Sequence, residues 1–367
     1  MAPVVLALRE RPVEFRVRVA VTAQHRALLD GVLPLFGIRP DRDLNLMRSG
    51  QSLTDVSVGV LAGLEPVLRA ERPDLVLVHG DTTTSLTAAL AAFYQQIPVG
   101  HVEAGLRSGD MENPFPEELN RRLTDGIAAL HFAPTAAARR NLRAEGVPPG
   151  GIFVTGNTGI DALVLMRERI RRRPPQLPPA AARAMDHPFI LLTAHRRENF
   201  GRPLENIFLA IRDAVRARPE MRVVCPVHPN PEAAAPARRI LGGNPRVALI
   251  KPLEYGALVF LMSRARFVVT DSGGIQEEAP GLGKPVLVLR KVTERPEAVR
   301  AGVVRLVGAD RAKVAKAILQ LLENRGLFDR MAKAVNPYGD GMAAGRTVEA
   351  LRFYFGFSPR RPLPFAP

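Results

Sequence analysis

The sequence of 367 residues predicts a two-domain α/β protein in which each domain is doubly wound (Rossmann-like), with helices on both faces of a parallel sheet. Three observations predict this class. Residues 75–78 form a continuous apolar run, which is typical of a strand buried inside a parallel sheet. Strand-like segments alternate with helix-like segments along the chain. A basic, Pro-rich stretch at 171–179 interrupts the alternation, which then starts again.

In the first half, apolar residues at helical spacing predict helices at residues 2–10, 28–36, 53–69, 83–94, 119–124 and 136–145. Strands are expected at 14–22, where polar and apolar residues alternate, and at 75–78, 98–102, 129–133 and 152–155. A doubly wound domain normally opens with a strand, whereas this sequence opens with a helix. We therefore expect Met1 to be an internal methionine of a longer natural protein.

In the second half, strands are expected at 189–193, 222–227, 247–250, 267–270, 285–289 and 303–307, with helices between them and one more at 312–324. The predicted domains are 1–170 and 186–341, joined by a linker at 171–185. The Pro-rich end, residues 357–367, is expected to be loosely ordered. Ligands of such folds bind beyond the carboxyl ends of the strands, so a site is expected in an interdomain cleft.

Composition narrows the possible functions. The longest apolar runs are far shorter than the ~20 residues that a membrane helix needs, so no membrane segment is expected. Cys225 is the only cysteine, which favours a cytoplasmic location. The formal net charge of +15 raises the possibility of nucleic-acid binding, but aromatic residues are 5% and only 169–173 is densely basic. We therefore expect an anionic small molecule, and no nucleic acid, as the partner.

Residues 267–279 combine an apolar strand, a turn at Ser272, Gly273 and Gly274, and the start of a helix. Unpaired N–H groups at the positive end of a helix form a site for anions, usually phosphate. Glu278 shares a helix face with Gly274, and we expect it to accept hydrogen bonds from neutral hydroxyls such as those of a ribose. The alternative is a tight turn followed by a solvated pair of glutamates.

Three carboxylates are candidates for proton transfer. Asp81 and Glu103 each follow an apolar strand, and Glu117 lies in the first turn of a helix that starts after two prolines. Asp81 could instead cap the next helix, and Glu117 could simply favour the helix dipole. Their shared position at strand ends favours a common site.

Cationic side chains follow strands of the second half. His195 ends one strand, His228 ends the next, and Arg295 follows a third, where they would complement an anion. His79 with Asp81, and His101 with Glu103, could suggest a metal site. No close set of His or Cys ligands accompanies them, so no metal is expected. The two histidines are interpreted as packed residues or as residues that support the site without contacting its ligand.

Together these motifs resemble the non-hydrolysing UDP-N-acetylglucosamine 2-epimerases, over residues 1 to about 355. The matching motifs are residues 79–84, 101–107, 116–121, 195–198, 271–278, 293–297 and 336–341. The resemblance implies a GT-B-like fold in which residues 342–367 carry a helix that crosses back to the first domain. It also implies interconversion of UDP-N-acetylglucosamine and UDP-N-acetylmannosamine for surface polysaccharide, without NAD or metal, by a homodimer.

The resemblance assigns roles by matching position. The implied catalytic carboxylates are Asp81, Glu103 and Glu117, with His195 as a substrate contact. The implied UDP contacts are Ser272, Gly273, Gly274, Glu278 and Arg295, with Leu253 and Leu258 lining the nucleotide pocket. Bacterial members are activated by UDP-N-acetylglucosamine at a second site, which Gln24, His25, Gln51 and His228 match. Gly50 stands where some members have a basic residue.

The family's chemistry explains the need for several carboxylates. No carbonyl acidifies the proton at sugar carbon 2, so UDP is expelled first, giving 2-acetamidoglucal, and UDP is then added back. Inversion at carbon 2 requires proton transfer on both faces. The family's first strand and its turn with Arg and Lys have no match here, so weak binding and turnover are expected. Rival interpretations are a GT-B glycosyltransferase, a hydrolysing epimerase and a non-catalytic nucleotide-sugar binder.

Overall fold

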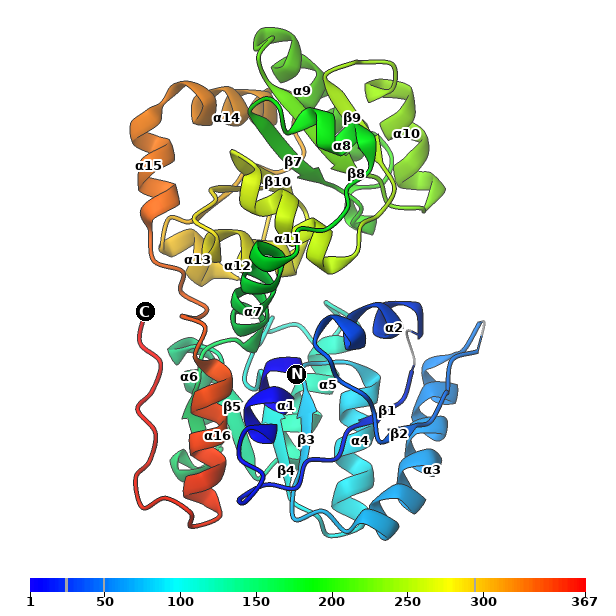
Figure 1. Ribbon diagram of the computed structural model, residues 1–367, viewed down its shortest axis with the longest axis vertical. Coiled ribbons are helices and arrows are strands. Elements are labelled where there is room, and N and C mark those ends of the chain that lie inside the picture. The colour runs from blue at the N-terminus through cyan, green and yellow to red at the C-terminus, as the bar shows by residue number, and fades with distance from the viewer. Residues whose placement is uncertain (24–25, 49, 294) are drawn as a thin grey trace. The chain divides into compact units, whose positions relative to one another are not determined.

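The computed structural model describes residues 1–23, 26–48, 50–293 and 295–367 (Figure 1). Contacts divide the chain into unit 1, Met1–Ala162 with Tyr338–Ala366, and unit 2, which is essentially Leu163–Pro337. The divisions thus fall near residues 162 and 337 and not at the expected 170 and 341. In the part that the structure describes, no helix combines the length and the apolar character that crossing a membrane requires.

The expected linker at 171–185 is part helical, with residues 173–178 between two helices. Helix α7 (Thr158–Arg172) runs into this segment, and α8 (Pro179–Ala184) lies inside it. Pro179 occupies the first position of α8, where its missing N–H costs nothing, and the alanines that follow favour a helix.

Unit 1 contains a four-stranded parallel sheet of order β3-β4-β5-β6. Its strands are β3 (Val76–His79), β4 (Val99–Val102), β5 (Leu130–Ala133) and β6 (Ile152–Val154). The connecting helices are α4 (Thr83–Tyr94), α5 (Glu117–Ile127) and α6 (Ala136–Ala144), with a 3₁₀ turn at Pro149–Gly151. All four strands run the same way, so the residues that follow them gather at one edge of the sheet.

The elements before this sheet are short, apart from one long helix. They are α1 (Ala2–Arg9), β1 (Ala20–Val21), α2 (Arg26–Leu35), β2 (Arg42–Asp43) and α3 (Leu53–Glu71). The strand expected at 14–22 is therefore reduced to two residues, which pair with β2. The backbone N–H of Val19 donates to the Asp41 carboxylate, 2.8 Å away, so a side chain takes the hydrogen bond that would extend the ladder.

Unit 2 contains a six-stranded parallel sheet of order β12-β11-β10-β7-β8-β9. Its strands are β7 (Phe189–Thr193), β8 (Arg222–Pro226), β9 (Val247–Ile250), β10 (Phe267–Thr270), β11 (Val286–Val288) and β12 (Val304–Leu306). The order of the strands reverses between β7 and β10, which are neighbours. In open α/β sheets ligands bind at such a switch point.

Helices surround this second sheet. They are α9 (Arg202–Ala217), α10 (Pro231–Leu241), α11 (Tyr255–Arg264), α12 (Gly273–Gly281), α13 (Pro296–Arg300), α14 (Arg311–Glu323) and α15 (Arg325–Lys333), with a 3₁₀ turn at Arg197–Asn199. The core between sheet and helices includes the fully buried rings of Phe189, Phe208 and Phe267.

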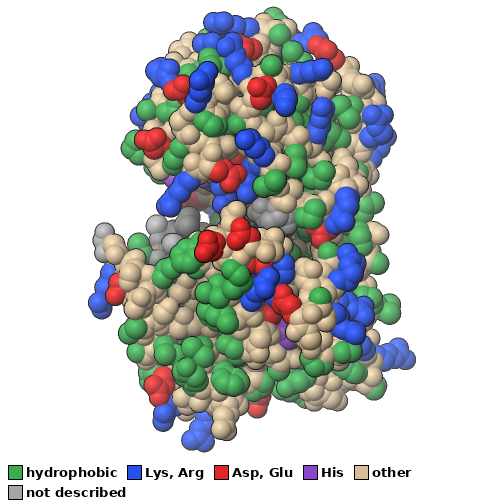
Figure 2. Space-filling view, turned by 180° about the vertical axis from the view of Figure 1, so that it is seen from behind, with side chains coloured by type: hydrophobic (Ala, Val, Ile, Leu, Met, Phe, Trp, Pro, Cys, Tyr) green, Lys and Arg blue, Asp and Glu red, His purple; other side chains and the backbone are tan. Residues whose placement is uncertain are grey.

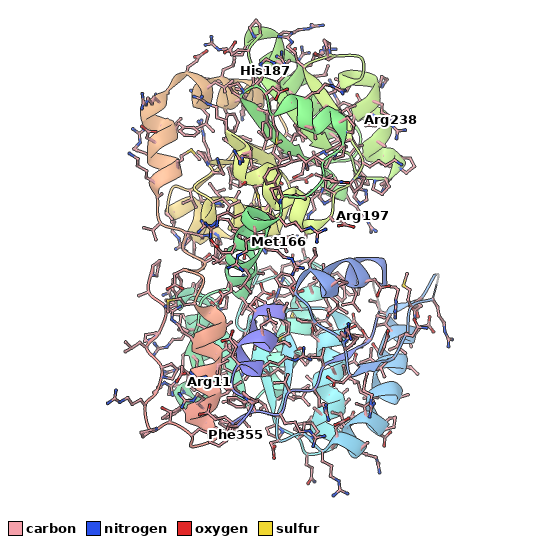
Figure 3. The ribbon with its side chains drawn as sticks, in the orientation of Figure 1. Arg11, Met166, His187, Arg197, Arg238 and Phe355 are labelled. Atoms are coloured by element: carbon pink, nitrogen blue, oxygen red, sulfur yellow. The ribbon has the colours of Figure 1, made fainter. Side chains whose placement is uncertain are left out.

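Helix α16 (Ala343–Tyr354) belongs to unit 1, where Val348 and Leu351 share a core cluster with Val4 and Leu8 of α1. Arg11 pairs with Glu349 of α16, and Figure 3 shows Arg11 beside this helix. At the start of α16 the Asp161 carboxylate accepts hydrogen bonds from two backbone N–H groups, at 3.1 and 2.7 Å. These are the orphan donors of a helix N-terminus.

The end of the chain, residues 357–367, was expected to be loosely ordered and is instead packed on the sheet. Phe365 is buried, and its N–H donates to the Val154 carbonyl at 2.8 Å. The Arg361 guanidinium donates to the carbonyl of Ile152. Since β6 is an edge strand, this segment covers an edge that would otherwise be open to pairing with another chain.

Candidate active site

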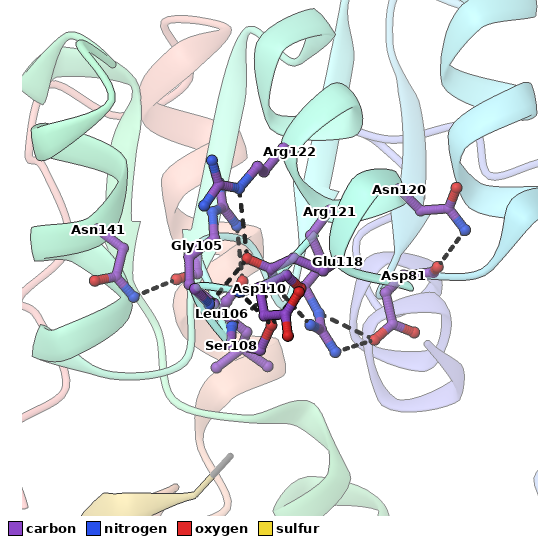
Figure 4. A network of polar contacts seen from close by, with 12 residues as sticks. Asp81, Gly105, Leu106, Ser108, Asp110, Glu118, Asn120, Arg121, Arg122 and Asn141 are labelled. Carbon is purple, nitrogen blue, oxygen red and sulfur yellow. Dashed lines mark hydrogen bonds and ion pairs between the residues drawn. The ribbon is translucent and has the colours of Figure 1, made fainter. Parts of the chain in front are cut away.

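Asp81 lies just beyond β3, at the carboxyl edge of the unit 1 sheet. One oxygen of its carboxylate accepts two hydrogen bonds from Arg121 of α5, at 3.1 and 2.7 Å (Figure 4). The Asn120 amide donates to the Asp81 carbonyl at 2.8 Å. The cap of α4 is Thr82, whose hydroxyl accepts from the Ser85 N–H. The alternative interpretation of Asp81 as a helix cap is therefore wrong.

Glu103 lies beyond the neighbouring strand β4, with its backbone in the left-handed region at φ 70°. Its carboxylate accepts a hydrogen bond from the Asn157 amide at 3.3 Å and lies 3.8 Å from Nε2 of His79. A Cβ on Gly80 would come within 3.1 Å of the same carboxylate. Glu103 is thus placed against the turn that carries Asp81, in a space that exists because residue 80 is glycine.

His79 gives this turn a neutral partner. Burial disfavours the charged imidazolium and lowers the pKa of His79 well below its usual value. The ring can therefore hydrogen-bond near Glu103 at neutral pH without adding a positive charge. His79 thus lies beside a candidate acid, 3.8 Å from the Glu103 carboxylate.

Glu117 is the first residue of α5, after Pro116. Its Oε2 is buried and has no hydrogen-bond partner among the described residues. Buried polar atoms nearly always have a hydrogen-bond partner, so a buried carboxylate oxygen without one is typical of a ligand-binding site. Arg121 lies one helical turn later, on the same face of α5, and contacts Asp81. This helix therefore links Glu117 to the turn of Asp81 and Glu103.

Glu118 holds the loop before α5, a role that the sequence analysis missed. Its fully buried carboxylate accepts hydrogen bonds from the N–H groups of Ser108 and Gly109 and from Arg121, at 2.9, 3.3 and 2.9 Å (Figure 4). Desolvation raises the pKa of Glu118, but these hydrogen bonds outweigh it and leave the pKa below its usual value. Sequence alone does not distinguish Glu118 from Glu117, since both open the same helix.

In unit 2, Ser272 precedes α12, and Gly273 and Gly274 are its first two residues. The Ser272 side chain makes no cap hydrogen bond, and the first turn contains no acidic residue. Ser272 donates its own N–H to the Thr270 hydroxyl at 2.9 Å, which fixes the turn after β10. The N–H groups of the first turn of α12 have no side-chain cap among the described residues, and they thus suit an anion.

Glu278 lies one turn further along α12 and is half-buried. Desolvation raises the pKa of Glu278 to about 7, against a hydrogen bond from Tyr255 that lowers it. The Tyr255 hydroxyl donates to Oε1 of Glu278 at 3.1 Å. The two leucines expected to line the nucleotide pocket, Leu253 and Leu258, lie on either side of Tyr255 in the sequence and are also half-buried.

Arg295 precedes α13, and its guanidinium pairs with the buried carboxylate of Glu277 on α12. Its backbone N–H donates to the Thr293 hydroxyl, which in turn donates to the Gln276 amide at 2.8 Å. The structure therefore fixes Arg295 to α12, the helix of the anion turn. An acidic partner on this arginine was not expected from the sequence.

His195 lies beyond β7, and the strand reversal places it beside Asp271, which lies beyond β10. One oxygen of this buried carboxylate accepts from the N–H groups of His195 and Arg196, both at 2.8 Å, and from Asn199 at 3.1 Å. The other oxygen has no hydrogen-bond partner in the described residues and lies 3.5 Å from Nδ1 of His195. Asp271 thus determines where His195 lies.

Burial lowers the pKa of His195, although the nearby Asp271 charge raises it. Its ring stacks on that of His228, with centroids 5.2 Å apart and planes at 6°. His228 was assigned to a second site, and the structure places it against the expected substrate contact.

The other residues of the second site are less informative. Gln51 hydrogen-bonds within its own loop, to the Leu46 carbonyl and the Arg48 N–H. Gln24 and His25 lie outside the described residues. Among the residues that are described, no three His, Cys, Asp or Glu side chains come together as a metal site.

Known proteins match nearly the whole chain. The family model described as UDP-N-acetylglucosamine 2-epimerase matches residues 6–352. The UDP-N-acetylglucosamine 2-epimerase of Escherichia coli strain K12 is 52% identical, over 96% of this chain and 94% of that protein. The enzyme of the same name from Salmonella typhimurium is 50% identical, over 96% and 95%.

A solved structure gives the same result. The UDP-GlcNAc 2-epimerase of Neisseria meningitidis, bound to UDP-GlcNAc, is 46% identical and superimposes with a TM-score of 0.87, over 96% of this chain and 95% of that one. The predicted two-domain, GT-B-like α/β class is confirmed by this likeness and by the two parallel sheets. The chain belongs to the UDP-N-acetylglucosamine 2-epimerase family.

Proposed function

We propose that this protein interconverts UDP-N-acetylglucosamine and UDP-N-acetylmannosamine. The observation that carries this proposal is the set of three carboxylates, Asp81, Glu103 and Glu117, which follow β3 and β4 and begin α5 in unit 1. A glycosyltransferase that only transfers a sugar needs no such set, whereas inversion of a carbon requires proton transfer on two faces.

The reaction balances without a redox cofactor. In the first step the bond from sugar carbon 1 to the UDP oxygen breaks, and UDP leaves with the electron pair. A carboxylate takes the proton from carbon 2, so a double bond forms between carbons 1 and 2, giving 2-acetamidoglucal. In the second step a carboxyl group returns a proton to the other face of carbon 2 and UDP adds back to carbon 1. Neither carbon is oxidised overall, so no NAD or other redox cofactor is required.

The three carboxylates have different environments, which suit them to different roles in the two proton transfers. Arg121 occupies one oxygen of Asp81 and thereby fixes its orientation. Glu103 lies beside the neutral ring of His79 and the amide of Asn157. Glu117 keeps an oxygen without a hydrogen-bond partner among the described groups, so it is suited to meet a substrate hydroxyl or proton.

Unit 2 provides the groups for UDP. The N–H groups of Gly273 and Gly274, together with the Ser272 side chain, would bind the pyrophosphate and stabilise the charge that develops as UDP leaves. Glu278, oriented by Tyr255, would accept hydrogen bonds from the ribose hydroxyls. His195 and Arg295, with Leu253 and Leu258, complete the proposed substrate contacts. The Neisseria meningitidis relative bound to UDP-GlcNAc supports this ligand class.

Incubation with UDP-N-acetylglucosamine in deuterated water tests the proposal. We expect UDP-N-acetylmannosamine with deuterium at carbon 2 and with UDP still attached. An unlabelled product would contradict the elimination step, and accumulation of free UDP with N-acetylmannosamine would favour a hydrolysing enzyme. Binding without any turnover would favour a nucleotide-sugar binder.

We also propose a homodimer, in which a second copy docks on unit 1. Helices α3, α4 and α5 form a groove of ≈ 520 Å³ whose lining is mostly apolar, including Val58, Leu61, Leu90 and Leu123. Val58 is 61% exposed and Leu123 47%, and Figure 2 shows hydrophobic side chains gathered on one face of this unit. Exposed apolar patches of this kind are typical of interfaces.

Leu123→Glu should shift the molar mass of the protein toward that of one chain, as measured by light scattering after gel filtration. Val13→Glu is the matched control, since Val13 is 99% exposed and lies outside the groove. A molar mass that is the same for wild type and Leu123→Glu would contradict this docking surface.

The activating second site is a further part of the proposal, with Gln24, His25, Gln51 and His228 as its residues. Because His228 stacks on His195, a nucleotide sugar bound at His228 would change the position of His195, a proposed substrate contact. If so, a trace of UDP-N-acetylglucosamine should accelerate the reverse reaction of wild type but not of His228→Ala.

A further inference from the structure

His101 of β4 makes two hydrogen bonds that a merely packed histidine does not need. The ring is fully buried, two residues before Glu103. Its Nε2 lies 2.9 Å from the carbonyl oxygen of Gly80, and its Nδ1 lies 2.6 Å from Oδ1 of Asp125. A carbonyl oxygen only accepts hydrogen bonds, so Nε2 must carry a hydrogen.

Asp125 of α5 determines the state of the other ring nitrogen. Its second oxygen accepts from the Gly105 N–H at 3.1 Å and from the Arg107 guanidinium at 2.8 Å. The positive charge of Arg107 and the Gly105 N–H both favour the ionised form of this carboxylate. An ionised carboxylate accepts hydrogen bonds only, so Nδ1 of His101 carries a hydrogen as well.

The chain of hydrogen bonds connects the two turns that carry candidate acids. It runs from Gly80, the residue before Asp81, through His101 and Asp125 to Gly105, two residues after Glu103. Gly80, Glu103 and Gly105 all have positive φ, at 70°, 70° and 82°. The two glycines adopt this conformation without strain. For Glu103 it persists only where the surroundings fix it, and such strained residues cluster at functional sites.

We propose that His101 is a positioning residue, which carries hydrogens on both ring nitrogens and holds the turns of Asp81 and Glu103 in the geometry that the reaction needs. The proposal rests on the epimerase function proposed above. His101 itself reaches neither carboxylate in the described contacts, so it acts through the Gly80 carbonyl and through Asp125.

His131 shows what a packed histidine looks like in the same sheet. It pairs with His101 in the register of β4 and β5 and is equally buried. Only its Nε2 is hydrogen-bonded, to the Asp125 carbonyl at 2.9 Å, while Nδ1 has no partner in the part of the chain described. It touches neither turn of the candidate acids, which makes it the matched control.

The test compares His101→Gln and Asp125→Asn with the control His131→Gln. For each protein, turnover of UDP-N-acetylglucosamine is measured together with UDP binding by calorimetry and with thermal unfolding. We expect kcat to fall on the order of 10²-fold in the first two variants, since small misplacements of catalytic groups have this effect. The KM and the affinity for UDP should stay near the wild-type values, because UDP contacts come from unit 2. His131→Gln should keep the wild-type kcat even where it loses stability.

Nitrogen-15 NMR of wild type provides a measurement that does not depend on folding of a variant. We expect two ring N–H resonances for His101, and a single one or none for His131. A single ring hydrogen on His101 would overturn the proposal, as would a folded His101→Gln with wild-type kcat. An equal loss of kcat and of UDP affinity would show general disruption and would also overturn it. Failure of the proposed function is distinguishable, because wild type would then lack turnover while the NMR test still decides the state of the ring.

Discussion

One oxygen of the Asp81 carboxylate accepts two hydrogen bonds from Arg121, at 3.1 and 2.7 Å, and the arginine is buried whereas Asp81 is half-exposed. This arrangement holds the acid in one orientation with its second oxygen turned away from the guanidinium. The buried guanidinium of Arg121 thus orients the more accessible carboxylate of Asp81.

Arg121→Lys should therefore lower kcat by roughly 10- to 10²-fold, because an ammonium is a point charge and lacks the paired N–H groups that orient Asp81. Steady-state assay of epimerisation measures the effect. Arg122→Lys, on the next residue of α5, is the control, since Arg122 contacts Glu118 at 3.4 Å and not Asp81. Equal kcat for the two variants would contradict the orienting role.

Gly80→Ala should damage catalysis beyond its effect on stability. The new Cβ would lie 3.1 Å from the Glu103 carboxylate, so that carboxylate must shift. Gly109→Ala is the control, because Gly109 also has positive φ, at 84°, but has nothing within 4 Å of its Cβ. Both variants should lose about 1 kcal/mol of unfolding free energy from backbone strain, and only Gly80→Ala should lose kcat. Similar kcat in both would show that the space beside Gly80 is unimportant.

Glu278 makes the stability of unit 2 depend on pH. Its pKa is about 7 in the folded protein against an ordinary value of 4.5, so between these values the folded state holds the proton that the unfolded state has lost. Stability contributed by this group is therefore complete below pH 4.5 and is lost as the pH rises to about 7. Glu278→Gln removes the titration but can still accept the hydrogen bond from Tyr255.

We expect Glu278→Gln to be more stable than wild type at pH 8, by up to about 3 kcal/mol, and equal to it near pH 4. Urea unfolding at several pH values measures the difference. At pH 8 the same variant should bind UDP more weakly, because an amide accepts fewer hydrogen bonds from the ribose than a carboxylate. A stability difference that does not change with pH would refute the assignment of this titration to Glu278.

Phe365→Ala should lower the unfolding free energy of unit 1 by about 3 kcal/mol, as for other buried phenylalanines. Leu363→Ala, at a residue that is 85% exposed, should have no measurable effect. Differential scanning calorimetry of both variants measures these changes in stability. If neither variant changed the unfolding free energy, the packing of the chain end on β6 would contribute nothing to stability.

The sequence was informative where local pattern decides structure. Buried strands such as Phe267–Thr270 were predicted correctly because an apolar run bounded by turn residues has few other solutions. The errors lie where distant contacts decide. Asp41 takes the N–H of Val19, and Val154 pairs with Phe365, more than 200 residues away.

In the candidate site, too, local pattern predicted some features and distant contacts determined the others. The positions of Asp81 and Glu103 at strand ends followed from the sequence, because parallel strands present their carboxyl ends at one edge. The partners of these residues did not follow. Arg121 reaches Asp81 across 40 positions, and Asp271 reaches His195 across 76, through a strand order that no local pattern specifies.

The left-handed backbone of Glu103 has a practical consequence for protein engineering. Glycine adopts that conformation without strain, so selection for thermal stability alone would favour glycine there and would remove the carboxylate that the proposed reaction uses. Thermal stability and turnover thus favour different residues at position 103. A screen for more stable variants therefore has to measure product formation as well as stability.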